Sequence, residues 1–104
     1  MKDLKFRGIY NGDNINVTLR CDMLDNQQDN ITVMQVLNGD SFSANDVNDS
    51  VVQKYFAAFI KKKVTLKDLK DHADTYTLDL YISNSNGTDW DVLVNGSHSI
   101  SESW

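Results

Sequence analysis

The chain of 104 residues has no proline, one cysteine and one glutamate. Because a lone thiol has no partner within the chain, Cys21 excludes an internal disulfide, and the fold must hold without one. No apolar run approaches the length of about 18 residues that a membrane-spanning helix needs. The first seven residues also lack the apolar core of a secretory signal, so we expect a cytoplasmic protein with no membrane contact.

Bases are outnumbered by acids, and the formal net charge is −5. Nonspecific nucleic-acid binding needs a basic face that displaces counterions, so this charge argues against a direct nucleic-acid partner. An acidic protein is instead steered toward basic protein surfaces. With 40% hydrophobic and 24% charged residues, the chain has an ordinary globular composition, and its length leaves room for one hydrophobic core.

Asparagine–glycine pairs recur along the chain. Four of its five glycines follow an asparagine, at 11–12, 38–39, 86–87 and 95–96. Both residues of such a pair readily adopt positive φ, as a type I′ hairpin turn requires. Apolar and polar residues alternate around these turns in the manner of half-buried strands. The pattern predicts strands over 4–10, 15–21, 31–37, 75–82 and 88–94, with a further short strand near 97–101.

Helical periodicity occurs once at length, because apolar residues recur at spacings of three and four from Val47 to Ile60. Asp46 and Asp49 at the start of this stretch and the lysines after it match the helix dipole. Thr65 followed by Asp68 resembles a capping box and predicts a second helix. The expected fold class is therefore α+β: a mainly antiparallel sheet of about five strands built from Asn-Gly hairpins, one main amphipathic helix over about 46–63 and one short helix over about 66–72, in a single domain spanning 1–104.

Charge is distributed in blocks along the chain. Residues 21–53 and 71–104 each carry six acids and no base, whereas residues 54–70 carry six lysines and one aspartate. One interpretation is a solvated surface whose opposite signs partly pair. The other is an acidic surface that imitates a phosphate backbone and docks where a nucleic-acid-binding protein expects DNA. Its candidate contacts are the acids of the first block: Asp22, Asp25, Asp29, Asp40, Asp46 and Asp49.

Sites for chemistry are not indicated by the residue pattern. The loop 84–91 alternates oxygen-bearing side chains but lacks the spacing and terminal glutamate of a calcium loop, and a hairpin turn explains it better. His72 and His98 have no partnered ligands, and we expect each at the surface or at an edge. Cys21 falls on the apolar face of its strand, where a thiol is inert. We therefore expect no metal, no cofactor and no enzymatic activity. Trp104 either folds back onto the body of the protein or anchors a partner.

The segment Asn48-Asp49-Ser50-Val51-Val52-Gln53-Lys54-Tyr55-Phe56-Ala57-Ala58-Phe59 resembles the strand-to-helix segment of a family of small phage-encoded anti-CRISPR proteins, which inhibit the RNA-guided nuclease of type II-A systems. The order of the preceding strands and the acidic approach to the helix are also similar. The resemblance implies a phage or mobile-element protein that presents acids to the site where the nuclease reads its short DNA motif. In that family the acidic character continues after the helix, whereas Lys61–Lys63 follow it here.

The sequence thus predicts a non-enzymatic, anti-CRISPR-like inhibitor that binds a basic surface of a host nucleic-acid-handling defence protein, with the CRISPR nuclease as the specific case. Such a protein would act in the cytoplasm of the host cell. The alternative is a small structural or assembly protein of a phage or prophage that self-associates through a sheet edge.

Overall fold

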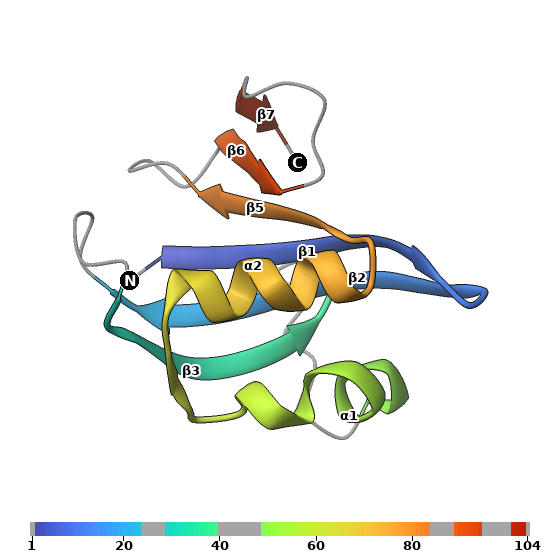
Figure 1. Ribbon diagram of the computed structural model, residues 1–104, viewed down its shortest axis with the longest axis horizontal. Helices are drawn as coiled ribbons and strands as arrows, with labels where there is room; N and C mark the ends of the chain where they lie inside the picture. Colours follow the sequence, from blue (N-terminus) through green and yellow to red (C-terminus); the bar gives the residue numbers. More distant parts are fainter. Residues whose placement is uncertain (1, 24–28, 40–48, 84–88, 95–100, 104) are drawn as a thin grey trace.

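The computed structural model describes residues 2–23, 29–39, 49–83, 89–94 and 101–103, and these contain one seven-stranded sheet in the order β4-β3-β2-β1-β5-β6-β7 (Figure 1). Every neighbouring pair of strands is antiparallel. The α+β class with a mainly antiparallel sheet is confirmed. The strands are β1 (Lys2–Tyr10), β2 (Asp13–Asp22), β3 (Ile31–Asn38), β4 (Lys63–Val64), β5 (Asp79–Ser83), β6 (Asp89–Val94) and β7 (Ser101–Ser103).

The first hairpin, β1–β2, turns at the Asn-Gly pair that the sequence indicates. Asn11 has φ 49° and Gly12 has φ 83°, and the strands pair from Tyr10↔Asp13 back to Lys2↔Cys21. Positive φ at both turn residues matches the twist of the flanking strands. The pair 38–39 also has a glycine at positive φ, but it ends β3. The pairs 86–87 and 95–96 lie outside the described residues.

The main helix is shorter than its periodicity predicts. Helix α1 spans Ser50–Phe56 and tightens into a 3-10 turn, η2, over Ala57–Phe59, while residues 46–48 are outside the described range. Lys61 adopts φ 55°, and the next residues leave the helix to form β4 against the start of β3. Backbone hydrogen bonds to the edge of the sheet thus replace helical hydrogen bonds in this segment. One of them runs from the Val33 N–H to the Lys62 carbonyl at 2.8 Å.

Helix α2 (Leu66–Thr75) is longer than expected at its C-terminal end. Its first turn has the predicted capping box, in which the Thr65 side chain accepts from the Asp68 amide and the Asp68 carboxylate accepts from the Thr65 amide. The helix continues past residue 72, and the chain then reverses at Thr77, which has φ 51°. Strand β5 consequently begins at Asp79, so its predicted start at 75 was wrong.

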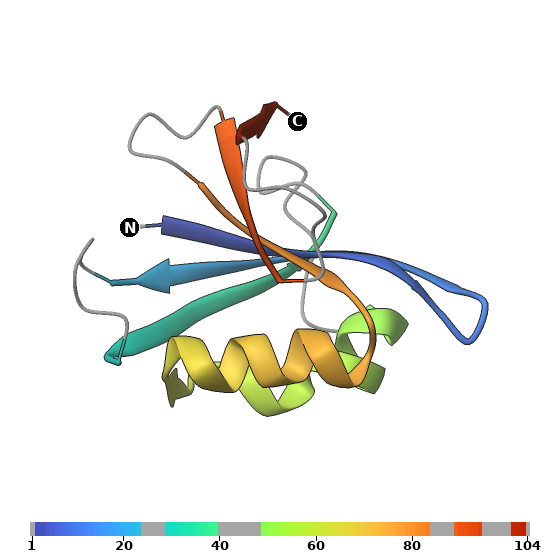
Figure 2. The same cartoon turned by 45° about the horizontal axis from the view of Figure 1, so that its top comes forward.

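Both helices lie on the same side of the sheet and cover its apolar face (Figure 2). The side chains buried there share the alternation predicted from the sequence, with those of α1, η2 and α2 packed against them. They include Leu4, Phe6, Ile15, Val17, Leu19, Cys21, Val33, Val36, Val52, Phe56, Phe59, Leu69, Ala73 and Leu80. Burial of this set supplies the main apolar stabilisation of the described fold.

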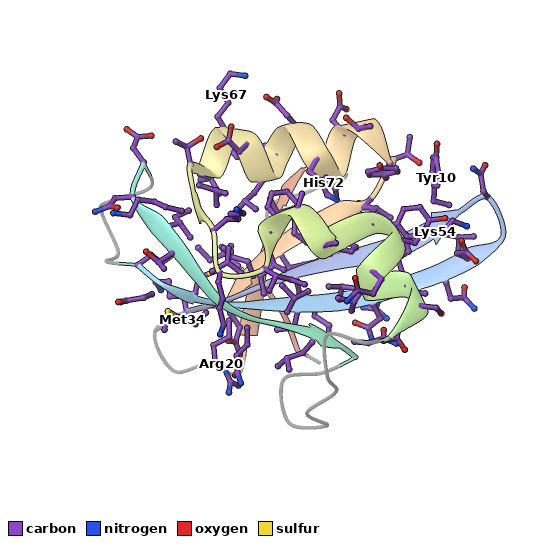
Figure 3. The ribbon with its side chains drawn as sticks, turned by 90° about the horizontal axis from the view of Figure 1, so that it is seen from below. Tyr10, Arg20, Met34, Lys54, Lys67 and His72 are labelled. Carbon is purple, nitrogen blue, oxygen red and sulfur yellow. The ribbon has the colours of Figure 1, made fainter. Side chains whose placement is uncertain are left out.

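The other face of the sheet is partly buried as well. Lys5 is only 1% exposed, and Thr18, its register partner on β2, is equally buried and donates its hydroxyl to the Gly39 carbonyl at 2.8 Å. Arg20 and Met34 project from this side, away from the helices (Figure 3). None of the described helices has the length and apolar character needed to cross a bilayer.

Candidate protein-binding surfaces

The acids predicted as contacts differ in their structural role and in their exposure to solvent. Asp49 is the N-cap of α1, where its carboxylate accepts from the amides of Val51 at 2.8 Å and Val52 at 3.4 Å. Asp22 ends β2 and Asp29 lies in the turn before β3, and both side chains are exposed. Asp25, Asp40 and Asp46 fall outside the described residues. Of the three acids that can be placed, Asp49 thus has a structural role as a helix cap, which accounts for an aspartate at this position.

These three acids also lie toward two ends of the sheet. Asp22 is paired in register with Thr32, close to the turn that holds Asp29. Asp49 instead begins the helix whose Lys54 reaches Asp13 at the opposite end of β2. A strand of that length spans about 30 Å. The described part of the predicted acidic block is therefore divided between two places.

Lysines surround one of these acids. A shallow, open depression on the surface is lined by Asp29, Leu66, Lys67, Lys70 and Asp71. Lys67 pairs with Asp71 at 2.7 Å, one turn further along α2. The surface around Asp29 therefore has charges of both signs. This agrees with the first interpretation of the charge blocks, a solvated surface whose opposite signs partly pair.

A polar cluster joins α1 to the β1–β2 hairpin. The Asp13 carboxylate accepts from the Tyr55 hydroxyl, and Lys54 Nζ lies 3.1 Å from the same oxygen. The hydrogen bond from Tyr55, followed by that from Lys54, lowers the pKa of Asp13. The hydrogen bond to Asp13, together with burial, raises the pKa of Tyr55, while the contact with Lys54 opposes this shift. The pKa of Lys54 is raised by its hydrogen bonds with Asp13 and then Tyr55. This cluster fixes α1 on the hairpin.

Next to this cluster, three tyrosines pack edge to face. The ring centroids of Tyr10, Tyr55 and Tyr76 are 4.9 to 5.9 Å apart, with interplanar angles of 71° to 88°. Perpendicular aromatic walls near a carboxylate are typical of cages that bind organic cations. Here the rings are in direct contact with one another, so the space that a cation would occupy is already filled. The cluster is a packed joint between elements.

His72 packs in the same joint between elements. From the sequence it was expected at the surface or at an edge. Its ring lies 4.6 to 5.6 Å from those of Phe6, Phe56, Phe59 and Tyr76. Nε2 is buried and has no hydrogen-bond partner, while a hydrogen bond to the Tyr55 backbone holds the ring. Burial lowers the pKa of His72 to about 4, and that hydrogen bond opposes the shift only in part. The expectation for His72 was wrong because Leu69, His72, Ala73 and Tyr76 follow the helical spacing that marks a buried face.

Cys21 is fully buried, as its place in the alternation predicts. Its thiol donates weakly to the Leu19 carbonyl at 3.6 Å. Burial, with a smaller contribution from Asp3, raises the pKa of this thiol to about 12. A thiol with so high a pKa is a poor nucleophile at neutral pH. Within the part of the chain that the structure describes, no three His, Cys, Asp or Glu side chains are grouped to hold a metal ion; the loop 84–91 is only partly described.

Three acids that the candidate list omitted lie on the paired strands β6 and β7. Asp89 and Asp91 are two residues apart on β6, and Glu102 on β7 is the register partner of Trp90. We call these three residues the acidic ribbon. The sequence signal for it was the base-free block 71–104, but only strand pairing shows that residues 89–91 and 101–103 are neighbours.

Three consecutive lysines mark the other end of the strand order. Lys61, Lys62 and Lys63 are all exposed, and the last of them belongs to β4. No ion pair between described residues involves any of them. We call this group the lysine edge. It is the densest run of bases in the chain.

Comparison with known proteins adds no relative: no protein-family model matches the chain, and neither the curated proteins nor the solved structures contain a significant match.

Proposed function

We propose that this chain is a non-catalytic inhibitor from a phage or other mobile element, which binds a basic surface of a host nucleic-acid-handling defence protein. The observation that carries the proposal is the distribution of charge: residues 71–104 hold six acids and no base, and three of these acids, the acidic ribbon, lie on the paired strands β6 and β7. This part of the chain therefore has negative charge that no base of its own block offsets. A surface built to hold a phosphate backbone offers the complementary charge.

The anti-CRISPR-like version of this proposal rests on the sequence resemblance at residues 48–59. In the fold this segment contains an N-capped helix, α1, whose Val52, Tyr55 and Phe56 are buried against the sheet. These side chains stabilise the fold, so the segment contributes to binding mainly by shaping the domain. We accordingly assign the electrostatic contact to the acidic ribbon, with Asp22 and Asp29 as the alternative site.

A nuclease assay tests the proposal. Cleavage of target DNA by a panel of guide-loaded type II-A CRISPR nucleases would be measured with increasing amounts of the protein, at low and high salt. We expect inhibition that weakens as salt rises, because screening shortens the reach of exposed charges from about 10 Å at 0.1 M to about 3 Å at 1 M.

Matched variants identify the contact surface. The triple variant Asp89→Asn, Asp91→Asn, Glu102→Gln removes three charges at nearly constant shape, and we expect about tenfold weaker inhibition if each exposed ion pair contributes about 0.5 kcal/mol. The variant Asp22→Asn, Asp29→Asn is the control and should inhibit like the wild type. Equal loss in both variants would contradict the assignment to the ribbon, and absence of inhibition at low salt with every nuclease would contradict the anti-CRISPR-like function.

A further inference from the structure

The lysine edge holds positive charge that the described acids do not pair. Bases elsewhere in the fold have acidic partners, as Lys54 has in Asp13 at 3.1 Å and Lys67 has in Asp71 at 2.7 Å. The three lysines of this edge are exposed and form no ion pair with a described residue. The neighbouring strand β3 has no charged side chain. In a chain of net charge −5, this edge therefore offers unpaired cations to an acidic partner.

Strand β4 also leaves part of its backbone open. It is first in the strand order and pairs with β3 alone, with Lys63 opposite Thr32. The Val33 amide donates to the Lys62 carbonyl at 2.8 Å, which makes Val33 and Lys62 a hydrogen-bonded pair. Because such pairs alternate with non-hydrogen-bonded ones in an antiparallel ladder, the N–H and C=O of Lys63 point away from β3. A further strand beside β4 would find a donor and an acceptor there.

The backbone at the start of the lysine edge has an uncommon conformation. Lys61 has φ 55°, in the left-handed region where the residue that ends a helical segment is most often glycine. A residue with a β-carbon is disfavoured there, because this atom comes too close to the following carbonyl oxygen. The left-handed residue lies between η2 and β4, so the three lysines follow one another where the strand begins. Strained backbone of this kind is concentrated at functional sites, which points to a use for the lysine side chain at this position.

Two kinds of anionic chain are attracted by three adjacent lysines: the phosphate backbone of a nucleic acid and an acidic peptide. Phosphate oxygens accept from the ammonium groups and from the Lys63 N–H, but they have no proton to donate to the Lys63 carbonyl. An extended peptide has both an N–H and a carbonyl at each position, so it pairs with both groups of Lys63. Opposite charges at facing positions of neighbouring strands also attract. The edge therefore fits an acidic peptide strand better than a phosphate chain.

We propose that the lysine edge is a docking site for an extended, acidic segment of a partner protein, which adds to the sheet as a strand beside β4. Hydrogen bonds with Lys63 fix the position of the segment, and its carboxylates select it by charge. Lysines at a sheet edge disfavour pairing with other strands in general, and an acidic strand is the kind for which that repulsion becomes attraction. Because β4 has two residues, the contact is short and the charges contribute most of the affinity. The acidic ribbon is not involved, so this docking is independent of the proposed inhibitory function.

Binding of short fluorescent peptides to the full chain tests the proposal. The probe is a peptide in which glutamate alternates with threonine, and its fluorescence anisotropy is followed as the protein is added. We expect binding at low salt and release at about 1 M salt, where screening is strong. A peptide with glutamine in place of each glutamate keeps the backbone and loses the charge, so it should bind at least about tenfold more weakly.

Two further comparisons separate strand addition from general attraction between charges. N-methylation of the glutamates keeps their carboxylates and removes their amide donors, so the methylated peptide should bind about fivefold more weakly to the wild type. The triple variant Lys61→Gln, Lys62→Gln, Lys63→Gln should bind the unmethylated peptide about tenfold more weakly than the wild type. Lys67→Gln with Lys70→Gln is the matched control, since both lysines are exposed on α2, and it should bind like the wild type.

The contrary results are equally specific. No binding of the glutamate peptide at low salt, equal binding of the methylated peptide, or the same loss in the triple variant and its control would each overturn the proposal. A single-stranded oligonucleotide is titrated in parallel, and tighter binding of it than of the peptide would assign the lysine edge to a phosphate chain instead. Circular dichroism verifies that the variants are folded. If the triple variant is unfolded, the comparison of methylated and unmethylated peptides on the wild type decides the question.

Discussion

At the scale of single residues, the structure assigns roles to several side chains that the sequence presents only as charges or as isolated polar residues. Asp13 is bound by Tyr55 and Lys54, and Asp49 caps a helix. His72 packs among aromatic rings with a buried, unpartnered nitrogen. These roles make two predictions about the response of the protein to pH and to substitution.

The first prediction concerns acid sensitivity at His72. The neutral ring fits the fold, and its pKa of about 4 lies below the value of 6.5 expected in the unfolded chain. The stabilisation is therefore complete above pH 6.5 and is lost as pH falls toward 4, because the unfolded state takes up the proton first. The full shift corresponds to about 3 kcal/mol, which we reduce to about 1–2 kcal/mol because the ring is partly exposed.

Urea unfolding at several pH values measures this effect. Between pH 7 and 5 we expect the free energy of unfolding to fall in the wild type and to change less in His72→Phe, which keeps an aromatic ring without a titrating group. His98→Phe is the control and should follow the wild type. Parallel pH profiles for wild type and His72→Phe would contradict the role assigned to His72.

The second prediction concerns the Asp13 cluster. In Asp13→Asn the carboxylate that raises the pKa of Tyr55 is gone, so the pKa of this phenol should fall toward its ordinary value. The variant should also be less stable at neutral pH, since the native state holds the Asp13 carboxylate with a lowered pKa and thereby gains stability above its unfolded-state pKa. Phenolate absorbance followed during a pH titration, with Asp22→Asn as the control, provides the measurement.

At the scale of elements, local signals were sufficient for some features and insufficient for others. The turn at Asn11-Gly12 and the cap at Thr65 depend on residues within four positions of each other, and both were predicted. The end of α1 depends on β4 pairing with residues some thirty positions earlier in the chain, at Ile31 and Thr32. Helical periodicity alone does not report such a competing partner.

The arrangement of the candidate acids in space could not be predicted, for the same reason. The sequence separates the acids into two blocks, but their grouping in space depends on strand register. Asp22 and Asp49 share a block yet lie toward opposite ends of β2, whereas residues 89–91 and 101–103, distant in sequence, are paired between β6 and β7. The sequence thus identifies the acids by type, and the choice among them as binding contacts stays a prediction.

A third prediction distinguishes the capping role of Asp49 from a role in binding. Asp49→Ala removes the acceptor for two helix amides and should destabilise the protein by about 1 kcal/mol. Asp49→Asn keeps an equally good N-cap without the charge, so its stability in urea should be close to that of the wild type. If Asp49→Asn is as unstable as Asp49→Ala, the cap does not explain this residue.

At the scale of the whole molecule, one joint of aromatic rings connects the sheet to both helices. The Phe56 ring lies 5.1 Å from Phe6 on β1, 6.4 Å from Phe59 and 4.9 Å from His72 on α2. A fully buried ring at such a junction contributes both apolar burial and close packing. Its loss should affect the entire described fold.

The fourth prediction follows from that position. Phe56→Ala should lower the free energy of unfolding by about 3–5 kcal/mol, because it removes apolar contacts and leaves a cavity. Ile9→Ala is the control, since Ile9 is 66% exposed and its removal should change stability by less than about 0.5 kcal/mol. Equal effects of the two substitutions in urea unfolding would contradict the placement of the core.

The lysine edge also places three exposed positive charges at one end of the strand order, in a chain whose net charge is −5. A protein with its bases gathered at one place experiences a torque in the field of a charged surface that it approaches. It therefore arrives already turned, with the lysine edge leading toward an acidic surface and facing away from a basic one. Two proteins of equal net charge would differ in this respect, because the orientation of an encounter depends on where the charges lie along the sheet.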